Sequence, residues 1–286
     1  MNSINFSLKI AHICRTLIFS IWVALIACTP QENVMVAGST TVLPIISKAA
    51  EQFSQTTGIS VIVNAGGSGV GINQLAGGKI AIGMISRNIT EKEKALYPDA
   101  ILTTHIIGKD AVVPVVSSEI YDAGITTLTL KQIGQIYLGE ISNWKQLGGP
   151  EKDILVVDKE ASRGTRHVFM QAILGNKEAL APGADLVLGA NNEEQTAISQ
   201  SDSAIGMLSH AWINNEVKGL AISLANGQHI EPNLQTIRSG SFPITRNLLL
   251  VTNGTPTGHS KELIDFILSA QGQKIVTESG YVGLQQ

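Results

Sequence analysis

The chain has 286 residues, of which 44% are hydrophobic, 5% are aromatic and 15% are charged. This mixture excludes a collagen, a disordered tail and a coiled coil. The formal net charge of −3 gives no basic surface field, so we expect no nucleic-acid partner. The length favours two structural units.

The first 28 residues have the pattern of a bacterial export signal. The mostly apolar run Thr16–Ala27 follows Lys9 and Arg15 and is too short to span a bilayer, which needs about 20 residues. The run ends in Leu-Ile-Ala-Cys28, which resembles a lipoprotein box. We therefore predict that residues 1–27 are a removed signal peptide, that Cys28 is lipidated, and that the mature chain is extracytoplasmic, in the periplasm or at the cell surface. An ordinary signal with a chance cysteine is the alternative.

The rest of the chain alternates between apolar strands, small polar turns and amphipathic helices, which favours an α/β fold with a mostly parallel sheet. Capping boxes at Thr90–Glu93 and Thr129–Gln132 predict two helix starts. Further helices are expected around 46–53, 72–77, 168–173, 260–268 and 272–279. Strands are predicted over Val34–Ala37, Ile59–Asn64, Ile80–Ile85, Ile154–Val157, Ala204–Leu208 and Leu248–Val251. Ala111–Ser117 contains Pro114, so it is expected to be an edge strand or a crossover between lobes.

Four turns share one chemistry. They are 38–41 (GSTT), 66–69 (GGSG), Ser86-Arg87 and 162–165 (SRGT). Each follows a predicted strand and most precede a helix, whose first backbone N–H groups attract anions. Hydroxyls and arginine add further donors. N-capping explains any one of these turns alone, but four in one chain indicate a shared oxyanion site.

Motifs for enzymatic chemistry are missing from the sequence. There is no P-loop, no G-x-S-x-G elbow and no H-E-x-x-H pair. Glu193, Glu194 and Asp202 are expected to be solvated charges in loops. We therefore predict no catalytic residue, metal or cofactor, although a triad assembled in space stays open.

Several longer blocks carry a resemblance to a known family. They are NAGGSGVGI (64–72), LTLKQIGQIYLGEISNWKQLGG (128–149), ASRGTRHVF (161–169), FPITRNLLLVTNG (242–254) and FILSAQGQKIVTESGYVGL (266–284). From about Val34 to Leu284 the chain resembles the short-chain form of the phosphate-binding proteins of bacterial phosphate ABC transporters.

The resemblance implies a two-lobed type II periplasmic-binding-protein fold. Each lobe would be a mostly parallel sheet flanked by helices, and two crossing hinge strands, Ala111–Ser117 and Leu248–Val251, would join the lobes. Lobe one would comprise residues 34–112 and 246–286, and lobe two residues 113–245. The implied function is high-affinity binding of inorganic phosphate and its delivery to the permease and ATPase subunits of an ABC transporter, by a monomer held at the membrane through a lipid anchor.

The family motifs also imply ligand contacts, at Ser39, Thr40, Thr41, Ser68, Gly69, Ser86, Arg87, Lys159, Arg163, Gly164 and Thr165. One turn departs from the family pattern Arg-x-x-x-Ser-Gly-Thr, because this chain has Lys159 for the arginine and Arg163 for the serine. Lysine lacks the bidentate fork of arginine, so Arg163 either supplies that fork or points to solvent.

Ligand selectivity is left open by the sequence. In long-chain relatives, an aspartate beside the third turn accepts a hydrogen bond from protonated phosphate, whereas this chain has Arg87 there. Asp110 and Asp158 are candidate substitutes. A carrier of sulfate or molybdate, and a lipoprotein sensor or surface factor without transport, are the alternative functions.

Overall fold

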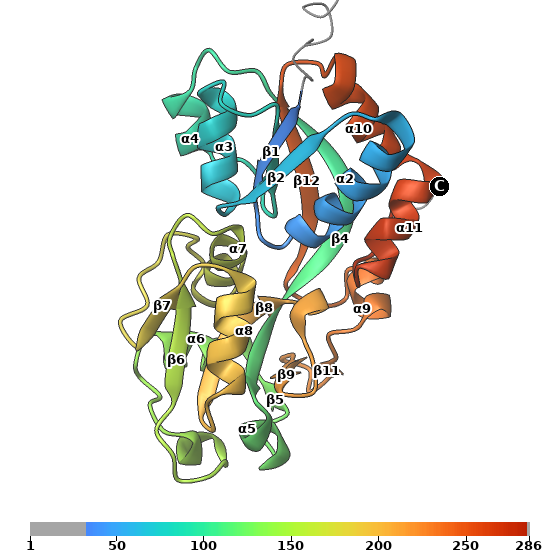
Figure 1. Ribbon diagram of the computed structural model, residues 1–286. Helices are drawn as coiled ribbons and strands as arrows, with labels where there is room; N and C mark the ends of the chain where they lie inside the picture. Colours follow the sequence, from blue (N-terminus) through green and yellow to red (C-terminus); the bar gives the residue numbers. More distant parts are fainter. Residues whose placement is uncertain (1–32, 285–286) are drawn as a thin grey trace, which may run out of the picture. The chain divides into compact units, whose positions relative to one another are not determined.

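A computed structural model describes residues 33–284 of the chain. The predicted signal peptide and Cys28 lie outside the described residues. Residues 34–284 form an α/β fold with two lobes (Figure 1), which confirms the predicted fold class. Among the described residues, no helix has both the length and the apolar character needed to cross a membrane.

The first lobe is built on parallel strands β1, β2 and β3; β12 pairs antiparallel with β3, and β4 pairs antiparallel with β12. Its buried side chains fall between residues 34–107 and 248–281. Its strands are β1 (Val34–Gly38), β2 (Val61–Ala65), β3 (Ile82–Ile85), β4 (Leu102–Ser117) and β12 (Thr245–Asn253), and its helices are α2 (Leu43–Thr57), α3 (Ser68–Ala76), α4 (Glu91–Leu96), α10 (Gly258–Leu268) and α11 (Ala270–Glu278).

The second lobe has its own hydrophobic core, drawn mostly from residues 111–244. Strand β6 runs parallel to β8 and β7, and β10 joins a small separate sheet with β5 and β11. Its strands are β5 (Thr127–Leu128), β6 (Leu155–Lys159), β7 (Leu186–Leu188), β8 (Ala204–Ser209), β9 (Val217–Gly219), β10 (Ala221–Ser223) and β11 (His229–Ile230). Its helices are α5 (Ser118–Asp122), α6 (Leu130–Tyr137), η2 (Trp144–Leu147), α7 (Gly164–Leu174), α8 (Asn191–Ser199), η3 (His210–Trp212) and α9 (Leu234–Ser239).

Strands β4 and β12 connect the lobes. Strand β4 pairs with β12 along Leu102–Ala111 and then with β8 along Val112–Val116, so one strand belongs to both sheets. Figure 1 shows β4 running from the neighbourhood of β12 to that of β8. Both strands extend beyond the predicted segments, because the sequence pattern marked only their most apolar stretches.

Local sequence signals explain several element boundaries. The hydroxyls of Thr90 and Thr129 accept the backbone N–H of Glu93 and Gln132, as the two capping boxes predict. Helix α2 has Pro44 in its first turn and ends at Gly58, whose φ of 76° favours glycine.

Of the two alternatives for Ala111–Ser117, the structure shows the crossover and not the edge strand: β4 has β8 on one side and β9 on the other, and the Pro114 carbonyl accepts the N–H of Leu220. Another expectation is wrong. Glu194 is not a solvated loop residue but lies fully buried in α8. Its polar neighbours in sequence hide the fact that one face of this short helix packs against β8.

Candidate oxyanion site

Three serines of the first lobe meet at the carboxyl ends of its parallel strands. Ser39 follows β1, Ser68 begins α3 and Ser86 follows β3. The Ser39 hydroxyl donates to Ser86 Oγ at 2.9 Å, and the Ser86 N–H donates to Ser68 Oγ at 3.1 Å. All three side chains are buried. The turns that the sequence singled out therefore form one hydroxyl cluster.

The 162–165 turn of the second lobe closes against this cluster. A Cβ atom on Gly164 would collide with the hydroxyls of Ser68 and Ser86, so only glycine permits this approach. The N–H of Gly69 donates to the Ser162 carbonyl at 3.1 Å. Thr165, in the first turn of α7, is buried beside the cluster.

Arg246, at the start of β12, links the hydroxyls of both lobes. Its Nη1 donates to Thr165 Oγ1 at 3.0 Å and approaches Ser86 Oγ at 3.4 Å, while Nη2 donates to Thr41 Oγ1 at 3.2 Å. The guanidinium is held by Asp110, with Nη2–Oδ2 at 2.7 Å and Nε–Oδ2 at 2.9 Å. Arg246 is 7% exposed, so its charge acts in a largely water-free setting.

Two further buried residues fix the position of Thr41. The Asn191 amide, at the first turn of α8, donates to Thr41 Oγ1 at 3.2 Å. The Tyr281 hydroxyl donates to the Thr41 carbonyl at 2.6 Å. The Thr41 hydroxyl thus accepts from Asn191 and Arg246, which leaves its proton available to an anion.

The three cations that the sequence predicts for the site are each paired with a carboxylate. Lys159 forms a buried ion pair with Glu194. Arg163 donates from Nε to Glu160 Oε2 at 2.8 Å, and its side chain lies against Gly67, the residue before Ser68.

Arg87 forms a bidentate pair with Glu93, at 2.7 and 2.8 Å. Its Nε is buried without a hydrogen-bond partner among the described residues, so the Nε–H group is free to donate to a ligand.

Glu194 lies in an unusual environment for a carboxylate. Burial raises the pKa of Glu194 above its ordinary value, and the Lys159 ammonium and the Met207 N–H offset that effect only in part. Glu194 therefore pairs with Lys159 at a place where both charged groups have lost their contact with water.

The two aspartates considered for selectivity are also paired. Asp110 accepts from Arg246 and from the Ser209 hydroxyl, at 2.9 Å. Asp158 accepts from Arg166 Nε, with both oxygens at 3.0 Å. The cluster therefore consists of donors, with no unpaired carboxylate beside the serines within residues 33–284. Those residues also contain no group of His, Cys, Asp and Glu side chains that could hold a metal ion.

Sequence reasoning missed Arg246, Asn191 and Tyr281. The only signal for Arg246 was a cation directly before the apolar run Leu248–Val251, in a block already noted for its family resemblance. Asn191 and Tyr281 lie in polar or terminal segments with no local motif.

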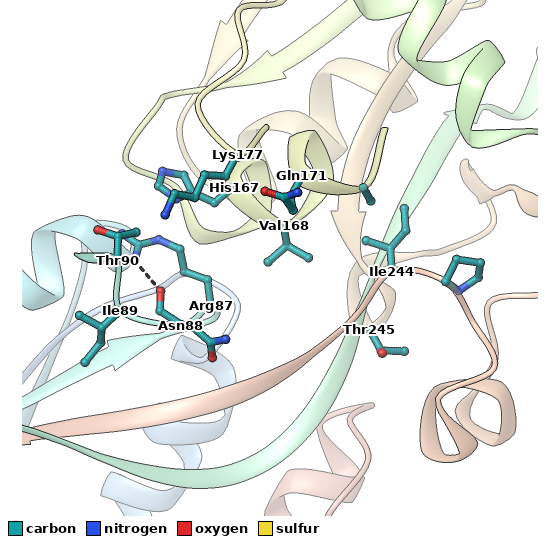
Figure 2. Close-up of a pocket in the computed structure, with 12 residues that line it drawn as sticks. Arg87, Asn88, Ile89, Thr90, His167, Val168, Gln171, Lys177, Ile244 and Thr245 are labelled. Carbon is teal, nitrogen blue, oxygen red and sulfur yellow. Dashed lines mark hydrogen bonds between the residues drawn. The ribbon is translucent and has the colours of Figure 1, made fainter. Parts of the chain in front are cut away.

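A cleft between the lobes adjoins the cluster. Figure 2 shows Arg87, Asn88 and Thr90 on one side and His167, Val168, Gln171 and Lys177 on the other, with Ile244 and Thr245 at one end. This cavity has a volume of about 450 Å³.

Comparison with known proteins relates the chain to a large group. Residues 27–271 match the PBP superfamily domain. The phosphate-binding protein PstS of Borreliella burgdorferi is 32% identical over 269 residues, which cover 90% of this chain and 93% of PstS. PstS of Bacillus subtilis is 30% identical over 252 residues, covering 87% and 80%.

Solved structures agree with these relatives. A proposed phosphate ABC transporter substrate-binding protein from Clostridium perfringens, solved with bound phosphate, superposes with a TM-score of 0.80 at 29% identity and covers 89% of this chain and 100% of its own. An ABC-type phosphate transport receptor from Vibrio cholerae superposes with a TM-score of 0.70 at 30% identity, and the match covers 88% of this chain and 100% of the receptor. With a two-lobed fold, a buried hydroxyl cluster and these relatives, the chain belongs to the PstS family of solute-binding proteins within the PBP superfamily.

Proposed function

We propose that this chain binds inorganic phosphate between its two lobes and delivers it to the permease of an ABC transporter. The observation that carries the proposal is Arg246, whose guanidinium contacts hydroxyls of Thr41 and Ser86 in one lobe and of Thr165 in the other. A tetrahedral anion bound there would bridge the lobes. The relatives named phosphate-binding protein PstS support phosphate as the ligand.

The ligand set that we propose combines the predicted residues with one that the structure adds. Hydroxyls and backbone N–H groups bind the oxygens, and the Arg246 guanidinium supplies charge-assisted donors. All four cations are paired with a carboxylate, but Arg246 is the one whose guanidinium also donates to hydroxyls of the cluster. The proposed contacts are Ser39, Thr40, Thr41, Ser68, Gly69, Ser86, Arg87, Lys159, Arg163, Gly164 and Thr165, together with Arg246.

Binding and release would use a hinge between the lobes. We place lobe one at residues 34–112 and 246–286 and lobe two at residues 113–245. In support, the buried side chains change from one core to the other between Ile107 and Ala111, and again between Ile244 and Leu248. Opening would separate Thr165 from Arg246 and Ser162 from Gly69, which would expose the ligand.

We further propose that the protein is a non-enzymatic, extracytoplasmic monomer, anchored through a lipid on Cys28. The site chemistry supports a binding role, because its side chains are donors held in place and none is arranged as a nucleophile with a base. The export signal and lipoprotein box support the location.

Calorimetric titration of the chain from residue 29 onward, refolded to remove bound anion, tests the proposal. Phosphate, sulfate and molybdate are compared at pH 7. We expect tight binding of phosphate and much weaker binding of the other two. Binding of sulfate or molybdate alone would reassign the cargo. A folded protein that binds none of them would overturn the transport function and favour a sensor or surface factor.

A further inference from the structure

The cleft beside the oxyanion cluster is larger than one phosphate group requires. A cavity of about 350 Å³ reaches Arg246 itself, and the cavity of about 450 Å³ in Figure 2 shares Arg87, Asn88, Val168 and Thr245 with it. Volumes of this size are typical of sites for small organic molecules, at about 300–1,000 Å³. Space is therefore available next to the cation that we assign to phosphate.

The walls of this cleft are cationic. No Asp or Glu is among the residues that line the two cavities, whereas Lys109 and Lys177 are. Neither ammonium group forms a salt bridge or a side-chain hydrogen bond with any residue in the range 33–284. Glu91 is close enough for Lys177 to contribute to its lowered pKa, but Glu91 is already paired with Lys94 at 2.8 Å. Lys109 lines the cavity that reaches Arg246 and Lys177 lines the cavity that contains His167, so each cavity has one ammonium group without a paired carboxylate.

His167 adds a free polar atom to the cavity that Lys177 lines. Its Nε2 contacts the Ala161 carbonyl at 2.8 Å, and its Nδ1 is buried without a hydrogen-bond partner in the described part of the chain. Burial, and then the nearby Arg87, lower the pKa of His167. Figure 2 shows His167 and Lys177 across the cleft from Arg87 and Thr90.

The middle of the cleft is apolar. Val168 and Ala172 of α7 face the cavity together with Ile89 and Ile244. These side chains suit a short carbon chain and not a second hydrated ion. Both lobes contribute to the lining, so an occupant would be enclosed by the same closure that encloses the phosphate group.

We propose that this cleft is a subsite for the organic part of a small phosphonate or phosphate monoester that carries a carboxylate. The tetrahedral group lies at Arg246, the carbon chain lies against Val168, and the carboxylate reaches Lys177 and His167. The inference rests on the proposed function, since it uses the same oxyanion cluster for the tetrahedral group.

Calorimetry of the refolded chain with inorganic phosphate, methylphosphonate and 3-phosphonopropionate tests the subsite. We expect 3-phosphonopropionate to bind about tenfold more tightly than methylphosphonate, because only the former offers a carboxylate to Lys177. Lys177→Ala should remove this difference and leave phosphate binding unchanged. Val168→Trp, which fills the cleft, should weaken 3-phosphonopropionate by about tenfold or more and spare phosphate.

Lys92→Ala is the matched control, since Lys92 is an exposed lysine that lines a different cavity. It should change none of the three affinities. Phosphate binding without phosphonate binding would overturn the subsite and leave the proposed function standing. Phosphonate binding that Lys177→Ala and Val168→Trp do not alter would overturn it as well. Failure of all three ligands would overturn both proposals.

Discussion

Arg246 combines charge with a geometry that lysine cannot reproduce. Its three guanidinium nitrogens divide their contacts between Asp110 on one side and the hydroxyls of Thr41 and Thr165 on the other. A lysine ammonium could neutralise Asp110, but it has no planar fork with which to reach both lobes. The site therefore depends on the shape of this side chain as well as on its charge.

Arg246→Lys should weaken phosphate binding by about ten- to a hundredfold, equivalent to ~1.4–2.8 kcal/mol. The chain should still fold, because Asp110 keeps a cationic partner. Calorimetry measures the affinity, and Arg238→Lys, at an exposed arginine on α9, is the control. Equal affinities for the two variants would remove Arg246 from the site.

Thr165→Ala should reduce phosphate affinity by about 1–3 kcal/mol, because a buried ligand oxygen loses its donor and Arg246 Nη1 loses its acceptor. Thr165→Ser keeps the hydroxyl and should recover most of the binding energy. If the serine variant binds as weakly as the alanine variant, the contribution of Thr165 comes from its methyl group and not from its hydroxyl.

At the scale of elements, a buried ion pair joins β6 to α8. Lys159 and Glu194 are both excluded from water, and Glu194 also accepts the N–H of Met207 in β8 at 2.7 Å. Removing one partner of such a pair leaves an uncompensated charge, whereas replacing both is often tolerated.

Glu194→Gln should therefore lower the free energy of unfolding by about 3–5 kcal/mol, although glutamine still accepts the Met207 N–H. The double variant Lys159→Met with Glu194→Gln should be more stable than Glu194→Gln alone. Urea denaturation gives both values. Additive losses in the double variant would show that the two side chains are not coupled.

The first turn of α7 packs against the first turn of α3 through Gly164. Gly164→Ala should weaken phosphate binding by about tenfold or more, because the added Cβ meets the hydroxyls of Ser68 and Ser86 and prevents full closure. Stability without ligand, measured by urea denaturation, should change little. Unaltered phosphate affinity would mean that the ligand-bound lobes do not approach this closely.

Local patterns predicted most of the elements and the hydroxyl turns, because each turn follows an apolar strand and carries its own Ser, Thr or Gly signature. Arg246, Asn191 and Glu194 carry no such signature. Arg246 meets Asp110 across 136 residues, and Asn191 meets Thr41 across 150. Only the fold brings such partners together, so a single sequence could not assign them. The ligand roles and lobe boundaries stay predictions.

For the molecule as a whole, the candidate site and the proposed membrane anchor lie in separate parts of the chain. The predicted lipidation site, Cys28, lies only a few residues before β1, so a lipid there would tether the first lobe by a short segment.

Cys28→Ser should release the protein from membranes or leave its leader uncut, with phosphate affinity of the folded part unchanged. Fractionation and mass spectrometry of the N-terminus measure this result. Cys14→Ser, inside the predicted leader, is the matched control and should leave both processing and retention intact. Retention of processed Cys28→Ser protein in the membrane would contradict lipid anchoring.

The Tyr281 hydroxyl donates to the carbonyl of Thr41, in the 38–41 turn, which lies 240 positions earlier in the chain. Val282 likewise pairs with Lys109 in β4. A growing or partly exported chain that stops before these residues already has the serines, threonines, Asn191 and Arg246, but it lacks the hydrogen bond from Tyr281 to the Thr41 carbonyl. Because a contact across 240 residues requires closing a very long loop, we expect full phosphate affinity to be acquired at the last step of assembly. Ligand capture would then distinguish finished molecules from nascent ones.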